Sequence, residues 1–203
     1  MKFPKEMMSG TPLTLDYFIE YETGLIEKTR KKFEKRGSTF LDIGSCEFLW
    51  TINLYDLFDE VHAFEPCEKV LSFYSRDLPG NITTHNVACS NFNGDYDMTF
   101  FENNIGMTMR TGSNDKVENW MKKGGASATF TAEVRTIDSY EFDSVDLIKI
   151  DAEGEDDNVI EGARNTIEKH KPLIIIDTLE RKNIDGYRCS WGSNLSFYEP
   201  IDK

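Results

Sequence analysis

The segment LIKIDAEGEDDNV, residues 147–159, combines an apolar run with a group of acidic side chains. Lys149 interrupts the run, and Asp151 and Glu153 follow it, two residues apart. On an extended chain this spacing places both carboxylates on one side, where Glu153 could take a proton from a hydroxyl as a general base. Since a buried lysine requires a carboxylate partner, we expect Lys149 to hold one of these acids in place.

The same acids could instead bind a metal. Asp177 follows the next apolar run, and the pair of Asp151 and Asp177 would offer oxygen ligands to Mg²⁺ or another divalent cation. A bound metal would lower the pKa of an acceptor hydroxyl and replace the base. Without a metal, His85, at the end of an earlier run, is a candidate base beside Glu153. The sequence leaves these alternatives open, including the alternative that Asp151 is only a turn residue.

The next three acids have a structural explanation. Glu155, Asp156 and Asp157 stand at the beginning of a predicted helix, 155–169. Acidic side chains stabilise the positive end of a helix dipole. We therefore assign these three residues to the start of the helix rather than to catalysis.

The rest of the sequence predicts the elements that position these residues. Strands that alternate with helices form a mostly parallel sheet with helices on both faces, and two terminal strands can add an antiparallel edge. The prediction is one α/β domain at 38–203, preceded by a helical extension at 1–37. An insertion at about 96–137 contains two exposed antiparallel strands. The seven predicted strands of the sheet are 38–44, 61–66, 82–88, 145–151, 172–178, 187–191 and 195–201, and the predicted helices are 14–35, 46–58, 67–77 and 155–169.

In such a sheet a ligand binds outside the carboxyl ends of the strands. Gly44 provides a tight turn after the first strand, where a ligand could approach the backbone. Glu65 follows Gly44 by 21 residues (65 − 44), close to the offset of about 20 residues at which an acid binds ribose hydroxyls. The turn has one glycine rather than the G-x-G-x-x-G that a pyrophosphate requires. This favours a nucleoside without phosphates, such as S-adenosylmethionine, over NAD.

The sequence also resembles a known family. The motifs FLDIGS, AFEP, NVACSNFNG, IGMTM, RTIDSY, DLIKIDAEGEDDNVIEGA and KPLIIID occur in the order and spacing of FkbM-type S-adenosylmethionine-dependent methyltransferases. The resemblance covers residues 38 to about 200, and its most specific part is the K-x-D-x-E-G string at 149–154. It implies a class I methyltransferase (Rossmann-like) fold. It also implies methylation of a hydroxyl on a sugar, a glycan or a related small molecule.

The resemblance further implies a set of cofactor-binding residues. One group would flank the methionine part of S-adenosylmethionine, another would hold the ribose, and a third would lie near the adenine. In chain order these residues are Asp42, Gly44, Ser45, Glu65, Pro66, Asn86 and Ala88.

One turn departs from the family pattern D-x-G-A-N-x-G. Ser45 and Cys46 replace Ala-Asn, and Phe48 replaces the second glycine. We expect Phe48 to narrow the approach to the amino-acid end of the cofactor. The alternatives to an active methyltransferase are an inactive cofactor-binding or regulatory module and an NAD-dependent oxidoreductase on a similar sheet.

Composition limits the partners. The net charge is −13, with 36 acids and 23 bases among 203 residues, which disfavours a nucleic-acid substrate. The four cysteines have no C-x-x-C spacing, and no stretch is long and apolar enough for a membrane span. The sequence therefore predicts a cytoplasmic enzyme with a small-molecule or glycan acceptor and no membrane partner, and it leaves the oligomeric state open.

Overall fold

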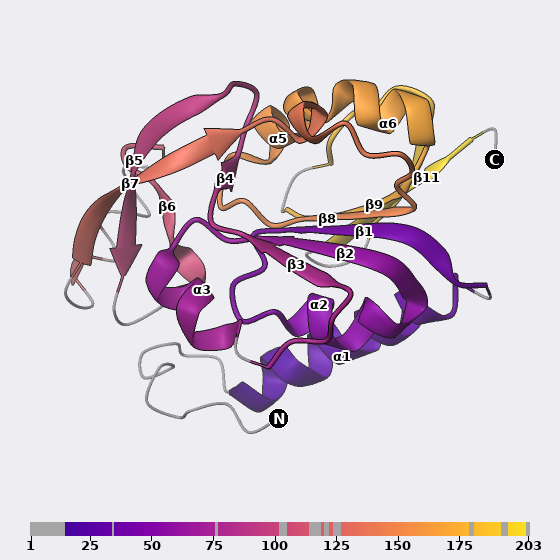
Figure 1. Ribbon diagram of the computed structural model, residues 1–203, viewed down its shortest axis with the longest axis horizontal. Helices are drawn as coiled ribbons and strands as arrows, with labels where there is room; N and C mark the ends of the chain where they lie inside the picture. The colour runs from indigo at the N-terminus through magenta and orange to yellow at the C-terminus, as the bar shows by residue number, and fades with distance from the viewer. Residues whose placement is uncertain are drawn as a thin grey trace.

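A seven-stranded sheet forms the centre of the computed structural model, which describes residues 15–33, 35–75, 77–101, 105–113, 119, 122–123, 127–178, 181–191 and 195–201 (Figure 1). Its strands are β1 (Gly37–Ile43), β2 (Phe58–Phe64), β3 (Ile82–His85), β8 (Leu147–Ile150), β9 (Leu173–Asp177), β10 (Tyr187–Trp191) and β11 (Leu195–Pro200). The strand order is β10-β11-β9-β8-β1-β2-β3. The five strands from β9 to β3 are parallel, whereas β11 and β10 are antiparallel. The predicted α/β class is confirmed.

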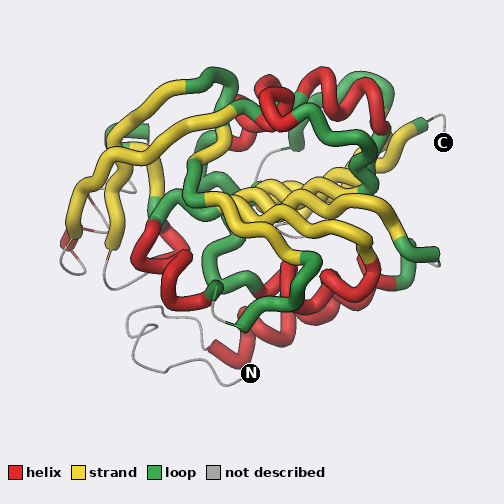
Figure 2. The backbone as a smooth tube through the Cα atoms, in the orientation of Figure 1, coloured by secondary structure: helices red, strands yellow, loops and turns green. Residues whose placement is uncertain are grey.

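Helices cover both faces of this sheet (Figures 1 and 2). One face packs against α1 (Leu15–Arg30) and α2 (Leu49–Leu54), and the other against α5 (Asp156–Gly162) and α6 (Arg164–His170). A further helix, α3 (Glu68–Tyr74), follows β2. Strand order reverses between β1 and β8, because β2 and β3 lie to one side of β1 and the later strands lie to the other. This switch point is where ligands bind in open α/β sheets.

Alternation along the strands decides which residues face which helices. Phe40 and Leu147 are paired neighbours and pack towards α1 and α2. Two residues further along the same strands, Asp42 and Lys149 occupy the next paired position on that face. Asp42 and Lys149 therefore extend the row of apolar core residues on this face to the carboxyl edge of the sheet.

A second, four-stranded sheet was not predicted as a unit. It consists of β4 (Ala88–Cys89), β5 (Gly94–Phe101), β6 (Met109–Arg110) and β7 (Ser127–Arg135), in the order β4-β7-β5-β6. The antiparallel pairing of β5 with β7 confirms the two strands expected in the insertion, but the second half of β5 is buried rather than exposed. The predicted strand at 82–88 was too long: β3 ends at His85, and Ala88 pairs with Val134 of β7 in the second sheet.

Two predicted helices are also divided. The segment 46–58 contains α2 followed by a 3₁₀ turn, η2 (Tyr55–Leu57), and 155–169 contains α5 and α6. A side chain at Gly162 would place its Cβ 2.0 Å from the Ser90 carbonyl oxygen, so the end of α5 lies directly against the turn after β4. Two further 3₁₀ turns are η3 (Ile105–Met107) and η4 (Ile137–Tyr140). Within the described residues no helix has the length and apolar character needed to cross a membrane.

Candidate functional site

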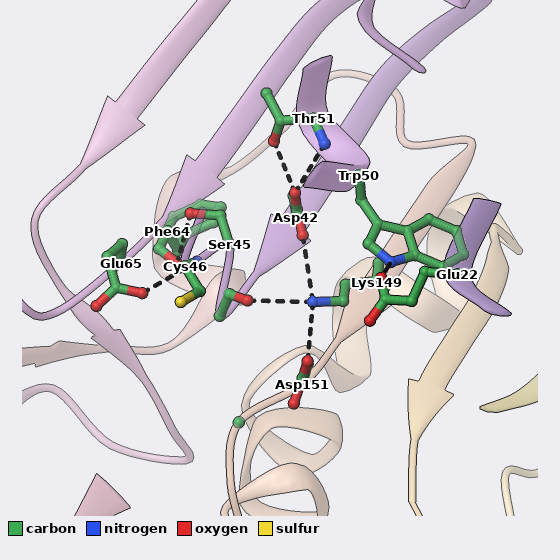
Figure 3. A network of polar contacts seen from close by, with 12 residues as sticks. Glu22, Asp42, Ser45, Cys46, Trp50, Thr51, Phe64, Glu65, Lys149 and Asp151 are labelled. Atoms are coloured by element: carbon green, nitrogen blue, oxygen red, sulfur yellow. Dashed lines mark hydrogen bonds and ion pairs between the residues drawn. The ribbon is translucent and has the colours of Figure 1, made fainter. Parts of the chain in front are cut away.

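A buried lysine organises the carboxyl edge of the sheet, where β1 and β8 end (Figure 3). Lys149 Nζ donates to the Gly44 carbonyl oxygen at 3.1 Å and to Asp151 Oδ2 at 3.3 Å. It also lies 3.7 Å from Asp42 Oδ1. Burial alone would lower the pKa of this ammonium, but the carboxylates of Asp151, Asp42 and Glu22 outweigh burial and raise the pKa. The expected pairing of Lys149 with an acid is confirmed, and the lysine remains charged.

Asp42 is the completely buried acid of this site. Its Oδ2 accepts hydrogen bonds from the Thr51 backbone N–H at 3.1 Å and from Thr51 Oγ1 at 2.6 Å. Its Oδ1 points towards Lys149 and has no hydrogen bond within the described part of the chain (Figure 3). Burial raises the pKa of Asp42, and Lys149 and Thr51 oppose that rise. The carboxylate therefore connects β1 to α2 and keeps one oxygen for the lysine.

Glu22 of α1 is a further acid at this site, and the sequence did not mark it. Its Oε2 accepts a hydrogen bond from Trp50 Nε1 at 2.7 Å. Burial raises the pKa of Glu22, while the charge of Lys149 lowers it and that of Asp151 raises it. Figure 3 shows the Glu22 carboxylate beside Lys149. We call Glu22, Asp42 and Asp151, which surround Lys149, the acidic cluster.

Gly44 is required by the close packing of two turns at the carboxyl edge of the sheet. Its φ is +70°, and a Cβ on this residue would lie 1.9 Å from the Asp151 carbonyl oxygen. The Asp151 N–H also donates to the Ile43 carbonyl oxygen at 3.0 Å. The space into which a Cβ at Gly44 would project is therefore filled by the turn after β8, which excludes a larger residue at this position.

Glu65 directly follows β2. In Figure 3 it lies on the other side of residues 44–48, which we call the β1 turn, from Lys149. Its side chain is 5% exposed. One carboxylate oxygen accepts from the Cys67 N–H at 2.8 Å and the other accepts from the Cys46 N–H at 3.1 Å. Burial raises the pKa of Glu65 to about 7, although both amide hydrogen bonds oppose the rise. The two amides hold the carboxylate in one orientation.

Three other predicted cofactor residues support the geometry around Glu65. Asn86 Nδ2 donates to the carbonyl oxygens of Glu65 and Pro66, at 3.0 Å each. Ser45 is buried, and its N–H donates to the Phe64 carbonyl oxygen at 3.0 Å. These hydrogen bonds fix the turns that follow β1 and β2.

The β1 turn keeps a left-handed backbone at two residues that are not glycine. Cys46 has φ 40° and Phe48 has φ 61°, the conformation that asparagine and glycine adopt most readily. The Phe48 ring is 1% exposed and is therefore covered by protein rather than facing an open site. Cys46 and Phe48 thus hold this turn at the expense of local strain.

A second group of acids lies where β8 and β9 end. Burial, followed by the charge of Asp151, raises the pKa of Asp177 to about 7. Burial also raises the pKa of Glu153 well above its usual range, and the charges of Asp151 and Asp177 add to that rise. Glu153 has a left-handed backbone with φ 46°. The structure thus brings Asp151, Glu153 and Asp177 within electrostatic reach of one another.

The predicted divalent cation receives no support from this geometry. Across the described ranges, no group of three or more His, Cys, Asp or Glu side chains is arranged to hold a metal. Asp151 is instead engaged by Lys149.

His85 lies on the opposite face of the sheet from Lys149. It pairs in register with Phe64, which faces α5 and α6. Its ring stacks on Phe64 with centroids 4.5 Å apart and contacts the Tyr140 ring edge at 5.1 Å. His85 Nε2 lies 2.9 Å from His62 Nδ1. Burial lowers the pKa of His85 to about 4, so the structure does not bring this candidate base together with the acidic cluster.

Ala88 lies in the second sheet rather than at the end of β3. It belongs to β4 and packs against Met98, Ala132 and Val134 in the second sheet. This position follows from the early end of β3, which the sequence did not reveal.

The three later acids stand at the start of α5, as predicted, and they also contact other elements. Glu155 Oε2 accepts from Ser90 Oγ at 3.0 Å, and its Oε1 lies 3.3 Å from Arg110 Nη1. Asp157 pairs with Lys182 at 2.9 Å. Glu155 therefore ties the second sheet to α5.

The fold and this edge define a doubly wound α/β domain with an acidic ligand edge at its switch point. Residues 42–187 match the family model described as the methyltransferase FkbM domain. The chain therefore belongs to the FkbM methyltransferase family. No curated protein matches the sequence.

Two solved structures are similar in fold. The methyltransferase FkbM from Methylobacillus flagellatus KT is 16% identical with a TM-score of 0.54, and the match covers 80% of this chain and 43% of that one. An rRNA methylase from Streptococcus thermophilus is 11% identical with a TM-score of 0.51, and the match covers 94% of this chain and 100% of that one. The chain thus spans less than half of the first protein. At these identities the likeness concerns the fold alone.

Proposed function

We propose that the protein transfers a methyl group from S-adenosylmethionine to a hydroxyl of a sugar, a glycan or a related small molecule. The observation that carries the proposal is the orientation of the Glu65 carboxylate by the amides of Cys46 and Cys67. Each carboxylate oxygen uses one lone pair for an amide and keeps another for a ribose hydroxyl. Family membership supports methyl transfer, and the fit of Glu65 to a ribose diol supports this cofactor.

When bound, the cofactor supplies an electrophilic methyl group. The chain must then hold the acceptor oxygen in line and remove its proton. Glu153 is suited to this role, because its raised pKa makes it a stronger base than an exposed carboxylate. As the acceptor oxygen bonds to the methyl carbon, the bond between that carbon and the sulfonium sulfur would break and release S-adenosylhomocysteine, and the acceptor proton would pass to a Glu153 carboxylate oxygen. Because the base must be ionised, methyl transfer is expected to increase as pH rises through the pKa of Glu153.

The second sheet is positioned to shape the acceptor pocket. Phe100 of β5 packs with Val70 of α3 and with Cys67, which precedes α3, and Cys46 of the β1 turn joins this cluster. The second sheet therefore packs against α3, which follows β2 and Glu65 in the chain (Figure 1). The net charge of −13 favours a neutral or cationic acceptor over a nucleic acid.

Calorimetric titration with S-adenosylmethionine and S-adenosylhomocysteine tests the cofactor. We expect micromolar binding that is lost in Glu65→Ala. If neither ligand binds the wild-type protein, the proposal is wrong.

The reaction itself is tested by an acceptor screen with labelled S-adenosylmethionine, using the wild type and Glu153→Gln. We expect Glu153→Gln to keep its affinity for S-adenosylhomocysteine and to lose transfer by at least about a hundredfold, which is the usual contribution of a general base. Cofactor binding without transfer to any hydroxyl would favour the alternative of an inactive binding or regulatory module.

A further inference from the structure

We infer that Glu22 is a further binding residue of the site and takes the ammonium group at the amino-acid end of the cofactor. This inference rests on the proposed function. Glu22 belongs to α1, outside residues 42–187 that match the family model, so family membership assigns it no role.

The position of Glu22 is set by packing. Trp50 of α2 is 3% exposed and donates its Nε1–H to Glu22 Oε2 at 2.7 Å. One helical turn further along α1, Ile26 packs in the same apolar cluster as Trp50. Glu22 Oε1 has no hydrogen bond with any part of the chain that the structure describes. The carboxylate is therefore held in place by one oxygen while the other remains available to a ligand.

The charges around Lys149 do not balance. The acidic cluster contributes three carboxylates, from Glu22, Asp42 and Asp151, and Lys149 contributes one ammonium. Lys149 Nζ already donates to Asp151 and to the Gly44 carbonyl oxygen. Asp42 Oδ1, fully buried and without a hydrogen bond, points into the same group. A second ammonium beside Glu22 would therefore neutralise one of the two excess negative charges of the cluster.

The position of the cluster identifies the part of the ligand that reaches it. In Figure 3, Ser45 and Cys46 lie between Glu65 on one side and Lys149 with Glu22 on the other. A nucleoside whose ribose is held by Glu65 would extend its 5′ substituent across this turn. In S-adenosylmethionine that substituent ends in an α-amino acid, which carries the required ammonium.

The experiment compares three ligands by calorimetry: S-adenosylmethionine, S-adenosylhomocysteine and 5′-methylthioadenosine, which has the adenosine and thioether but no amino acid. The variant is Glu22→Gln, because an amide oxygen can still accept from Trp50. The matched control is Glu27→Gln, an exposed acid on the same helix. We expect Glu22→Gln to weaken the two amino-acid ligands by about tenfold or more, the usual value of a hydrogen bond to a charged group. Binding of 5′-methylthioadenosine should change by less than about twofold, within the scatter of a substitution that removes no contact.

The outcomes separate this inference from the proposed function. If the wild type binds the ligands but Glu22→Gln weakens none of them, or all three equally, the inference is wrong and the cofactor proposal stands. If the wild type binds none, both fail. Trp50→Phe is a second variant that keeps the charge of Glu22 and removes its anchor. It should weaken the amino-acid ligands by less than Glu22→Gln does, and an equal loss of 5′-methylthioadenosine would indicate general damage and contradict the inference.

Discussion

The two faces of the central sheet differ sharply at the same carboxyl edge. On the face of α1 and α2, the column of β1 and β8 ends in Asp42 and Lys149. On the face of α5 and α6, the column of β2 and β3 ends in the stacked rings of Phe64 and His85. One face therefore carries a charged network and the other carries an aromatic cluster.

The difference shows that neighbours, and not burial alone, decide the charge of a buried base. Burial lowers the pKa of His85 to about 4, because its neighbours are rings and a second histidine. Burial has the same direct effect on Lys149, but three carboxylates reverse it and raise the pKa. A position at the sheet edge is therefore not sufficient for a role in the site, and the face on which a side chain lies matters as much.

The largest expected difference between the faces is in stability. Lys149→Met leaves Asp42 and Asp151 buried or half-buried without their cation, which is expected to cost about 3–5 kcal/mol. His85→Phe keeps the stacking on Phe64 and Tyr140 and is expected to cost about 1 kcal/mol or less. Urea unfolding of both variants measures the free energies of unfolding.

Similar losses in the two variants would show that the charged network contributes no more than the aromatic cluster. A double variant, Lys149→Met with Asp42→Asn, sharpens the result. Removing the charge of Asp42 should restore part of the stability that Lys149→Met loses, because the two charges are coupled.

The second comparison concerns two glycines that lie close to a carbonyl oxygen: Gly44 in the turn after β1, and Gly162 at the end of α5. Gly44→Ala meets the Asp151 carbonyl oxygen at 1.9 Å and also has φ +70°. Gly162→Ala meets the Ser90 carbonyl oxygen at 2.0 Å, but Gly162 is the last residue of α5 and has no positive φ. Left-handed strain costs about 1–2 kcal/mol, and alanine in a helix gains up to about 1 kcal/mol over glycine.

Gly44→Ala should therefore lose about 2 kcal/mol more stability than Gly162→Ala, because only the first combines the clash with strain. Thermal and urea unfolding of the pair measure this difference. The reverse order would mean that the turn after β4 is less able to move than the turn after β8.

The pH dependence of stability should also have opposite signs for the acids on one face of the sheet and the histidine on the other. Folding raises the pKa of Glu65 to about 7, so the folded state holds its proton more tightly and loses stability as pH rises from about 4.5 to 7. Asp177, also raised to about 7, acts in the same direction. Folding lowers the pKa of His85 to about 4, so its contribution is lost as pH falls from about 6.5 to 4.

Melting temperatures between pH 4.5 and 8 test these signs. Relative to wild type, Glu65→Gln should be more stable at pH 8 than at pH 5, whereas His85→Phe should be more stable at pH 5 than at pH 8. If the melting temperatures of the wild type and both variants change with pH in parallel, the predicted opposite pH dependence is wrong.

Many of the polar residues at the carboxyl edge of the sheet could be predicted, because strand ends and acidic residues are recognisable from the local sequence. The pairing of Lys149 with a carboxylate followed from the cost of a buried ammonium. The face of His85 could not be predicted, since a shift of one residue in a strand moves a side chain to the other face. Glu22 was missed because only the docking of α1 on the sheet brings it to Lys149. The contact of Gly44 with the Asp151 carbonyl oxygen could not be predicted, because Asp151 lies more than 100 residues away.

The smallest expected effect concerns left-handed residues on the two sides. Cys46 in the β1 turn has φ 40°, and Lys171 at the end of α6 has φ 50°. Cys46→Asn and Lys171→Gly introduce residues that accept this conformation, so each should stabilise the protein by about 0.5–1 kcal/mol. The two substitutions should therefore change the free energy of unfolding by similar amounts.

Cofactor affinity should distinguish them, because the Cys46 N–H holds the Glu65 carboxylate and Lys171 caps a helix on the other face. Relief of strain at Cys46 makes the turn that orients Glu65 less costly to maintain, so S-adenosylhomocysteine should bind more tightly to Cys46→Asn than to wild type. Lys171→Gly should bind it with unchanged affinity. If both variants gain stability and neither changes affinity, the strain in the β1 turn is unrelated to ligand binding. Equal gains in affinity would mean that overall stability, rather than the geometry of this turn, limits binding.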